Sequence, residues 1–265
     1  MEIFGYLCAI LIGLSLGLIG GGGSILTLPV LVYLFGINPV LATAYSLFVV
    51  GVTSFFGAMG KLRHGLVDIR TTVVFAVPSF IAVYVTRLYL VPAIPEVIYT
   101  ASSWSLTKNL LIMIFFAIIM MLAAMSMIKS KREATEKGEE RKFNYPGIIL
   151  DGLVVGLLTG VVGAGGGFLI VPALVILARL PMKLAIGTSL SIIAVKSLIG
   201  FIGDIQVGQD IDWYFLLSFA GLSVVGIFVG NYVSKFFTDK KLKKIFGWFV
   251  LVMSVYILFK ELIIG

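Results

Sequence analysis

The stretch GLIGGGGSILTLPVL, Gly17–Leu31, decides how this chain folds, because it places four consecutive glycines inside an otherwise apolar segment. A glycine destabilises a helix interior by about 1 kcal/mol relative to alanine, so four together end a helix. The flanking apolar segments, Ile3–Ile19 and Ser24–Phe35, are short or barely long enough to cross a membrane. The pattern predicts a broken or re-entrant helical hairpin whose tip is the glycine cluster.

A second copy of this stretch, GVVGAGGGFLIVPAL, occupies Gly160–Leu174. Pro29 and Pro172 lie 172 − 29 = 143 positions apart, and with that one shift many Gly, Leu, Ser and Pro positions agree without a gap. Composition alone does not readily produce such an ordered run. We therefore predict an internal duplication, with residues 1–128 and 147–265 as two transmembrane repeats and 129–146 as a cytoplasmic basic linker.

The composition places the chain in a membrane. Sixty per cent of the residues are apolar and only 12% are charged, about half the usual charged share of a soluble domain. Between Ile3 and Gly60 there is no Asp, Glu, Lys or Arg. These figures exclude a soluble enzyme and a nucleic-acid-binding module, and the net charge of +7 indicates cytoplasmic loops rather than nucleic acid.

Further apolar segments have the length of a membrane span, about 20 residues, or nearly so. There are three in each half of the chain: Val40–Gly60, Thr71–Leu90, Asn109–Ile128, Leu184–Gly203, Trp213–Ser234 and Ile245–Phe259. The segment Phe168–Ala178, after the second glycine cluster, is too short to be another.

Loop charges give the orientation of the repeats. Basic residues dominate Lys129–Lys142, Lys235–Lys244 and Lys61–Arg70, which the positive-inside rule assigns to the cytoplasm. The counterpart of Lys61–Arg70 in the second half, Asp204–Asp212, has three Asp and no base, so we expect it outside. The predicted fold is an all-α polytopic membrane protein of two inverted repeats, each a glycine-broken helical hairpin plus three transmembrane helices.

Two half-helices begin just past the glycine clusters, and helix N-termini present unpaired N–H groups with partial positive charge. Inverted symmetry would bring both towards the bilayer midplane, where they would suit a small anion. The glycines let backbone N–H groups face a cavity, and Ser24 is a candidate N-cap. The predicted backbone part of a substrate site is Gly20, Gly21, Gly22, Gly23, Ser24, Gly163, Gly165, Gly166 and Gly167.

Lys196 lies inside an apolar span, where a lysine costs about 3 kcal/mol unless it faces a polar cavity or a partner. A cation there favours an anionic substrate; the alternative is that the side chain snorkels to the interface. Hydroxyls recur nearby and add Thr43, Ser46, Thr188 and Ser189 to the predicted site. Hydrogen bonds between helices are an equally good explanation for any one of these hydroxyls.

Other residues have plainer interpretations. The small-xxx-small pairs Gly13/Gly17 and Gly156/Gly160 predict close helix packing, and we expect Gly13→Ala to impair transport less than Gly22→Val or Gly165→Val. Arg87, near a helix end, is expected to snorkel. No cofactor, metal site or ATP-binding motif is predicted.

The two glycine-rich stretches, each followed by an A-x-x-x-S-L sequence (Ala42–Leu47 and Ala185–Leu190), resemble the sulfite exporter TauE/SafE family. The resemblance covers nearly the whole chain, including the basic linker. It implies a prokaryotic cytoplasmic-membrane carrier of sulfur-containing anions such as sulfite, sulfoacetate and thiosulfate. The family's glycine clusters correspond to Gly20–Gly23 and Gly163–Gly167, whereas the role given to Lys196 rests on its chemistry alone.

The predicted function is a secondary transporter that moves a small sulfur-containing anion across the membrane by alternating access, and an anion channel is the alternative. The expected partners are the small anionic substrate and the lipid bilayer, with no nucleic acid. The sequence leaves open the coupling ion, a proton or sodium, and the oligomeric state.

Overall fold

A computed structural model describes residues 2–21, 23–101, 104–129, 145–162, 166–176, 178, 180–236 and 239–264. Over these residues the chain is helical apart from one small hairpin, which agrees with the predicted all-α membrane class. Each half begins with a helix, a glycine turn and a half-helix, and then continues with three longer helices.

The helices of the first half begin and end close to the apolar segments of the sequence. They are α1 (Glu2–Ile19), α2 (Ser24–Tyr33), α3 (Pro39–Arg63), α4 (Ile69–Val85) and α6 (Lys108–Lys129). The end of α4 continues through a π-helical turn, Thr86–Leu90, into the short α5, Val91–Ala93. An antiparallel hairpin, β1 (Val97–Ala101) and β2 (Trp104–Thr107), which the sequence did not predict, leads to α6.

The second half repeats this order of helices. It contains α7 (Tyr145–Val162), α8 (Gly167–Ile176), α9 (Met182–Gln206), α10 (Trp213–Val233) and α11 (Asp239–Phe259), with a 3-10 turn at Ser234–Phe236 and a π-helical turn at Lys260–Ile264. Within the described residues, four helical stretches meet the length and hydropathy of a membrane span: α3, Ile69–Ala93, α9 and α10. The helices α6 and α11, at 22 and 21 residues, have the length of a span as well.

Glycines allow two pairs of helices to pack backbone against backbone. A Cβ on Gly13 would overlap the carbonyl of Ser223, and one on Gly17 would lie 2.6 Å from the carbonyl oxygen of Ile227. On α7, Gly156 approaches the backbone of Ser79 in α4 in the same way, whereas Gly160 lies against the side chain of Thr86 in the π-helical turn after α4. The packing role predicted for these small-xxx-small pairs is confirmed, and at Gly13 there is no room for a methyl group without a shift of the backbone.

The equivalent helices α3 and α9 pack against each other in opposite directions. Gly57 of α3 approaches Leu190 of α9, whereas Gly51, earlier in α3, approaches Leu198, later in α9. The turn after α3 therefore lies beside the start of α9, where Leu66 is packed on Gly187. The turn after α9 lies beside the start of α3, so the two turns are at opposite ends of the pair.

Matching hydrogen bonds tie each turn to the other half of the chain. Thr188 of α9 accepts a hydrogen bond from the backbone N–H of Asp68 (2.9 Å), and Tyr45 of α3 accepts one from the backbone N–H of Asp212 (2.6 Å). Both aspartates are N-caps, of α4 and α10 respectively, and each side chain accepts a hydrogen bond from the first turn of its helix. Positions 45 and 188 correspond under the 143-residue shift, whereas Asp212 lies one residue beyond the counterpart of Asp68, so the two ties match to within one residue.

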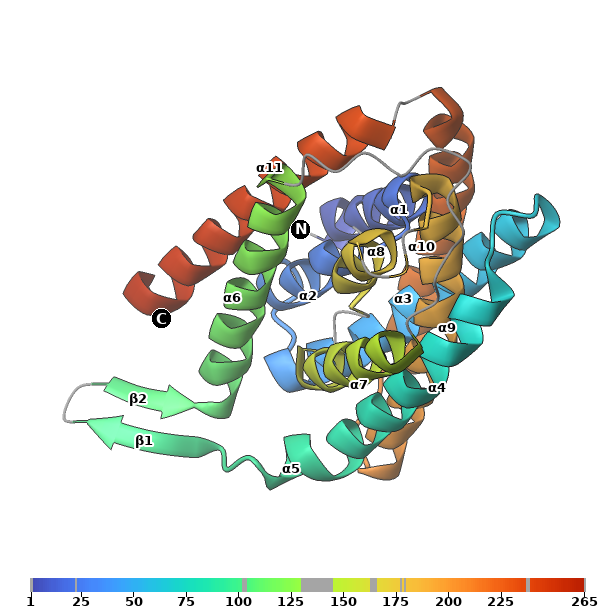
Figure 1. Cartoon of the computed structure of the whole chain (residues 1–265). Coiled ribbons are helices and arrows are strands. Elements are labelled where there is room, and N and C mark those ends of the chain that lie inside the picture. Colours follow the sequence, from blue (N-terminus) through green and yellow to red (C-terminus); the bar gives the residue numbers. More distant parts are fainter. Residues whose placement is uncertain are drawn as a thin grey trace.

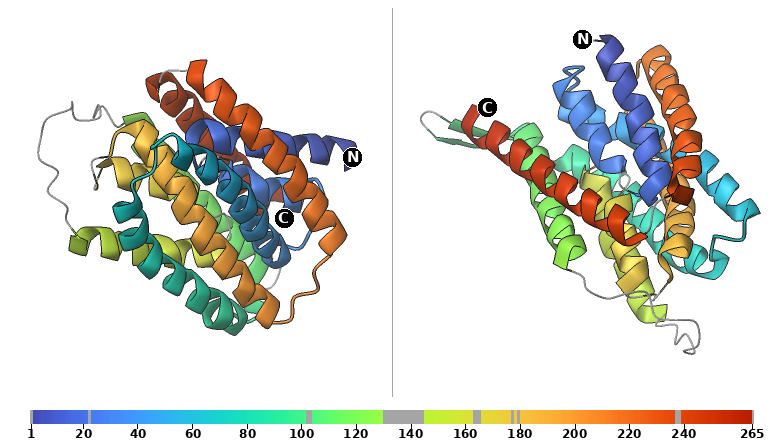
Figure 2. Two further views of the ribbon diagram at one scale, coloured as in Figure 1. Left: turned by 90° about the vertical axis from the view of Figure 1, so that its right-hand side faces the viewer. Right: turned by 90° about the horizontal axis from the view of Figure 1, so that it is seen from above.

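In Figure 1, α6 and α11 lie side by side along one edge of the molecule, and α4, α9 and α10 lie along the other. The broken pairs α1–α2 and α7–α8 lie between these two groups, as the views in Figure 2 also show. Each half contributes helices to both groups, so the halves are interleaved rather than separate lobes.

The placement of the two turns makes a topological prediction. In a Cys8→Ser background, which removes the one native cysteine, His64→Cys and Asp210→Cys add exposed thiols to the α3–α4 and α9–α10 turns. Because these turns lie at opposite ends of α3 and α9, we expect a membrane-impermeant maleimide to label them from opposite faces. Labelling of both thiols from one face would contradict an inverted arrangement of the repeats.

Candidate functional site

The two glycine turns meet at the centre of the molecule. A Cβ on Gly21 would overlap the carbonyl of Gly167, and a Cβ on Gly167 would lie 2.6 Å from the Cα of Gly21. Both residues are buried, and the half-helices α2 and α8 start immediately beyond these turns. The structure thus brings together the described parts of both predicted glycine clusters, while Gly22, Gly163 and Gly165 lie outside the described residues.

Two other residues of the first turn differ from the prediction in their roles. Gly23, rather than Ser24, is the N-cap of α2, and it makes no side-chain cap. Ser24 is the first helical residue, and its hydroxyl donates back to the carbonyl of Gly21 at 2.6 Å. The Ser24 hydroxyl therefore closes the turn, because its single proton is already used within it.

Lys196 reaches the second glycine turn from α9. Its side chain is fully buried, and Nζ donates a hydrogen bond to Oγ1 of Thr159 on α7 at 3.0 Å. A Cβ on Gly166, which has a positive φ of 59°, would lie 2.7 Å from this Nζ. Lys196 therefore does not extend to an interface, and neither ion pair found among the described residues includes it.

The predicted hydroxyls divide into two groups. Ser189 donates to the carbonyls of Gly20 (2.9 Å) and Ile186 (2.8 Å), and Thr43 donates to the carbonyl of Val40 (2.6 Å). Thr188 is used in the tie to Asp68. Ser46 differs, because its buried hydroxyl has no hydrogen-bond partner among the described residues.

Unpartnered buried hydroxyls continue along α3 and α9. Thr53, Ser54 and Ser197 share this property with Ser46. Ser54 and Ser197 are repeat mates, and Thr53 is the mate of Lys196. Buried polar groups are nearly always hydrogen-bonded, so the hydroxyls without described partners where α3 and α9 cross are polar groups that could bind a polar ligand.

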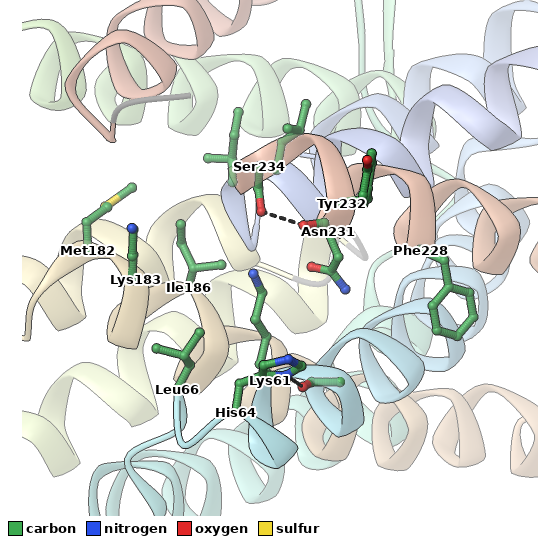
Figure 3. Close-up of a pocket in the computed structure, with 13 residues that line it drawn as sticks. Lys61, His64, Leu66, Met182, Lys183, Ile186, Phe228, Asn231, Tyr232 and Ser234 are labelled. Atoms are coloured by element: carbon green, nitrogen blue, oxygen red, sulfur yellow. Dashed lines mark hydrogen bonds between the residues drawn. The ribbon is translucent and has the colours of Figure 1, made fainter. Parts of the chain in front are cut away.

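A pocket of about 370 Å³ leads from the α3–α4 turn towards the first glycine turn. Figure 3 shows the Lys61 ammonium and the Asn231 amide pointing into it, with Lys183 across from them. Its inner wall includes Ile186, which touches Gly20. This pocket is lined by three basic residues, Lys61, His64 and Lys183. Its electrostatics therefore suit an anion.

The sequence prediction missed one buried ion pair. Arg87 is 1% exposed and lies 3.3 Å from Asp204, measured from Nε to Oδ2, so the expectation that it snorkels is wrong. Asp204 was placed in the outer loop but lies in the last turns of α9, where it is 3% exposed. Arg87 and Asp204 each lie near the end of an apolar segment of the sequence. Their pairing becomes visible only in the structure, where α9 packs against α4 and the π-helical turn that follows it.

Comparison with known proteins gives the family of this fold. The family model "Sulfite exporter TauE/SafE" matches residues 5–257, which is nearly the whole chain. The chain belongs to the TauE/SafE family. The resemblance noted from the two glycine-rich stretches is thereby confirmed, and this TauE/SafE chain is a multi-pass membrane protein.

Similar proteins bear compatible names. A "Probable membrane transporter protein" of Xylella fastidiosa (strain 9a5c) is 28% identical over 259 residues, which is 95% of this chain and 92% of that protein. The "Probable membrane transporter protein YunE" of Bacillus subtilis (strain 168) is 28% identical over 245 residues, 80% of this chain and 82% of its own length. No solved structure is significantly similar to this TauE/SafE chain.

The contact between the glycine turns predicts how this TauE/SafE chain responds to a single methyl group. Gly21→Ala forces backbone against backbone, and overpacking of this kind costs about 1–3 kcal/mol. For a chain of this size each kcal/mol lowers Tm by about 2–4 °C. We expect a measurable fall in Tm in a thermal-shift assay of the purified protein, and an equal fall for Gly13→Ala.

The matched control is Gly221→Ala in α10, where an added Cβ meets nothing within 4 Å. Its Tm should be unchanged or slightly higher, since alanine is the better helix former. Equal losses in Gly21→Ala and Gly221→Ala would show that the turn contact has no special importance.

Proposed function

We propose that this protein is a secondary transporter that moves a small sulfur-containing anion across the cytoplasmic membrane by alternating access between two inverted repeats. The observation that carries the proposal is the environment of Lys196. Its ammonium group is completely buried, has a hydroxyl as its hydrogen-bond partner, and lies against the glycine turn that precedes α8.

The charge balance at this turn favours an anion. The start of α8 contributes partial positive charge, and Lys196 adds a full one. A buried unpaired ammonium is expensive inside a bilayer, and a bound oxyanion would offset that cost. Sulfite, thiosulfate, sulfoacetate and related compounds carry the negative oxygens that such donors recognise, and the family membership makes them the class to test first.

Alternating access is supported by the arrangement of the helices. The mates α3 and α9 are antiparallel, as mates related by a two-fold axis in the membrane plane would be, and the other contacts recur in matched pairs such as α1–α10 and α4–α7. The pocket opens at the Lys61 end, whereas Arg87 and Asp204 are buried at the other end. An open pocket at one end, with a buried ion pair at the other, favours a carrier over the alternative, an anion channel.

Binding is tested by thermal shift across sulfite, thiosulfate, sulfate, sulfoacetate, taurine and chloride. A ligand at 100 times its Kd stabilises the folded state by about 2.7 kcal/mol, which is several degrees in Tm. We expect at least one sulfur anion to exceed chloride clearly. That anion should also show counterflow in proteoliposomes, which a channel does not support. No stabilisation beyond that of chloride would contradict the proposed substrate class.

The variant Lys196→Met tests directly whether the charge of Lys196 binds the anion. At an effective dielectric of about 20, a unit charge about 4 Å from a monoanion contributes about 4 kcal/mol before desolvation. Even heavily discounted, the loss should weaken apparent affinity at least about tenfold, since each 1.4 kcal/mol is a factor of ten. Expression should be nearly normal, and Lys196→Arg should recover part of the affinity.

The control for Lys196→Met is Ser223→Ala, which removes a buried hydroxyl on α10 that has no partner among the described residues and lies outside the proposed site. Substrate affinity and Tm are measured on the same preparations. Ser223→Ala should keep wild-type affinity. Unchanged affinity together with a raised Tm in Lys196→Met would remove Lys196 from the site.

A further inference from the structure

Arg87 has hydrogen-bonding capacity that the protein does not use. Its side chain is fully buried, yet Nη1 and Nη2 have no hydrogen-bond partner among the described residues. The 3.3 Å approach of Nε to Asp204 is an ion pair without hydrogen-bond geometry. Arg87 also sits in the π-helical turn Thr86–Leu90, a local irregularity that occurs frequently at functional sites.

The surroundings of Arg87 are the repeat-related counterpart of the open pocket. With the shift of the duplication, Asp204 corresponds to Lys61, Thr43 to Ile186 and Val40 to Lys183, and all three counterparts line the pocket. Arg87 itself corresponds to Gly230, the neighbour of the pocket residue Asn231. One half of the molecule therefore has a pocket where the other has a buried guanidinium.

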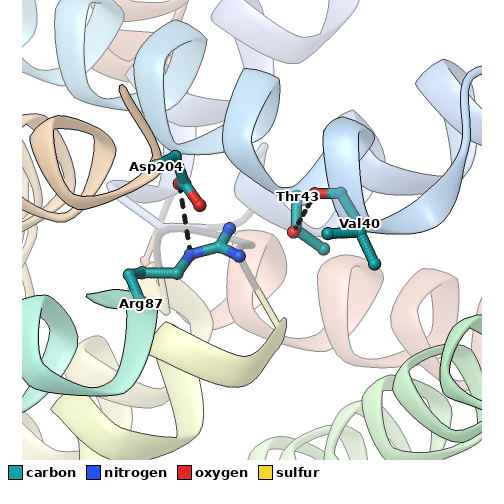
Figure 4. Close-up of polar contacts among 4 residues, drawn as sticks. All are labelled: Val40, Thr43, Arg87 and Asp204. Atoms are coloured by element: carbon teal, nitrogen blue, oxygen red, sulfur yellow. Dashed lines mark hydrogen bonds and ion pairs between the residues drawn. The ribbon is translucent and has the colours of Figure 1, made fainter. Parts of the chain in front are cut away.

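Figure 4 shows Arg87 with Asp204, Thr43 and Val40. The terminal nitrogens of Arg87 point away from Asp204 and towards Thr43 on α3. The Thr43 side chain is fully buried, and its hydroxyl donates its proton to the carbonyl of Val40 in its own helix. A guanidinium fork is suited to two oxygens of one oxyanion, and the Thr43 hydroxyl opposite it could donate to a third oxygen by turning away from the Val40 carbonyl.

We propose that Arg87 and Thr43 form a second site for the transported oxyanion, on the Asp204 side of the glycine turns. The site rests on the proposed function, because an anion reaches it only when the carrier opens on that side. In the closed state, the Asp204 carboxylate supplies the negative charge that Arg87 otherwise receives from the substrate. Opening then exchanges one negative partner of Arg87 for another, so the guanidinium is never left buried without one.

The decisive variant is Arg87→Gln/Asp204→Asn, which removes both charges together. Removing one partner of a buried ion pair is strongly destabilising, whereas neutral replacement of both avoids a buried unpaired charge. Apparent affinity is taken from initial uptake rates in right-side-out and inside-out membrane vesicles. The probe is whichever of sulfite, thiosulfate and sulfoacetate stabilises the wild-type protein most. We expect affinity at least tenfold weaker from the Asp204 side and within twofold of wild type from the Lys61 side.

Gln206→Ala is the matched control. It removes the 2.6 Å hydrogen bond from Tyr84 that joins the same two helices, α4 and α9, near the same end. It should leave affinity unchanged on both faces. Wild-type affinity of the double variant on the Asp204 side would overturn the second site, and so would an equal loss on both faces, since Arg87 would then act through the fold. Failure of the wild-type protein to transport any of the three probes would instead refute the proposed function.

Discussion

The centre of this molecule depends on the close approach of two stretches of backbone, at Gly21 and Gly167. A methyl group on either residue would separate them. Because both turns end helices in the interior of the bundle, their backbone groups are withdrawn from lipid, as irregular backbone at membrane depth must be. The half-helices α2 and α8 start at this contact, and the lysine on α9 and the inner end of the pocket adjoin the two glycine turns.

The two halves share a fold but not a charge pattern. Lys196 has Thr53 as its mate, Asp204 has Lys61, and Arg87 has Gly230. These differences give the two ends of the helix bundle different electrostatics. A basic pocket opens at the Lys61 end, and a buried ion pair lies at the Arg87 end. Such an asymmetry of charge would suit the carrier proposed above, in which one site is presented alternately to two sides.

Sequence reasoning found the helices but assigned some side chains wrongly. Ser24 looked like an N-cap, yet its hydroxyl turns back to Gly21 and Gly23 takes the cap position. Arg87 looked like a snorkelling residue because it lies near the end of an apolar run, yet α9 brings Asp204 to it. In both cases, what decided the role was the neighbour across a turn or a helix interface, which periodicity and composition do not encode.

The sequence by itself determined the membrane class, the order of the helices and most of the helix ends to within a few residues. These follow from local composition, because glycine runs break helices and uncharged apolar segments partition into lipid. The duplication stays a prediction from the 143-residue shift. Only the tertiary structure decided that the two glycine turns touch, that Lys196 reaches the second of them, and that Arg87 and Asp204 pair. These contacts join residues far apart in the chain, so they depend on how the interleaved halves pack.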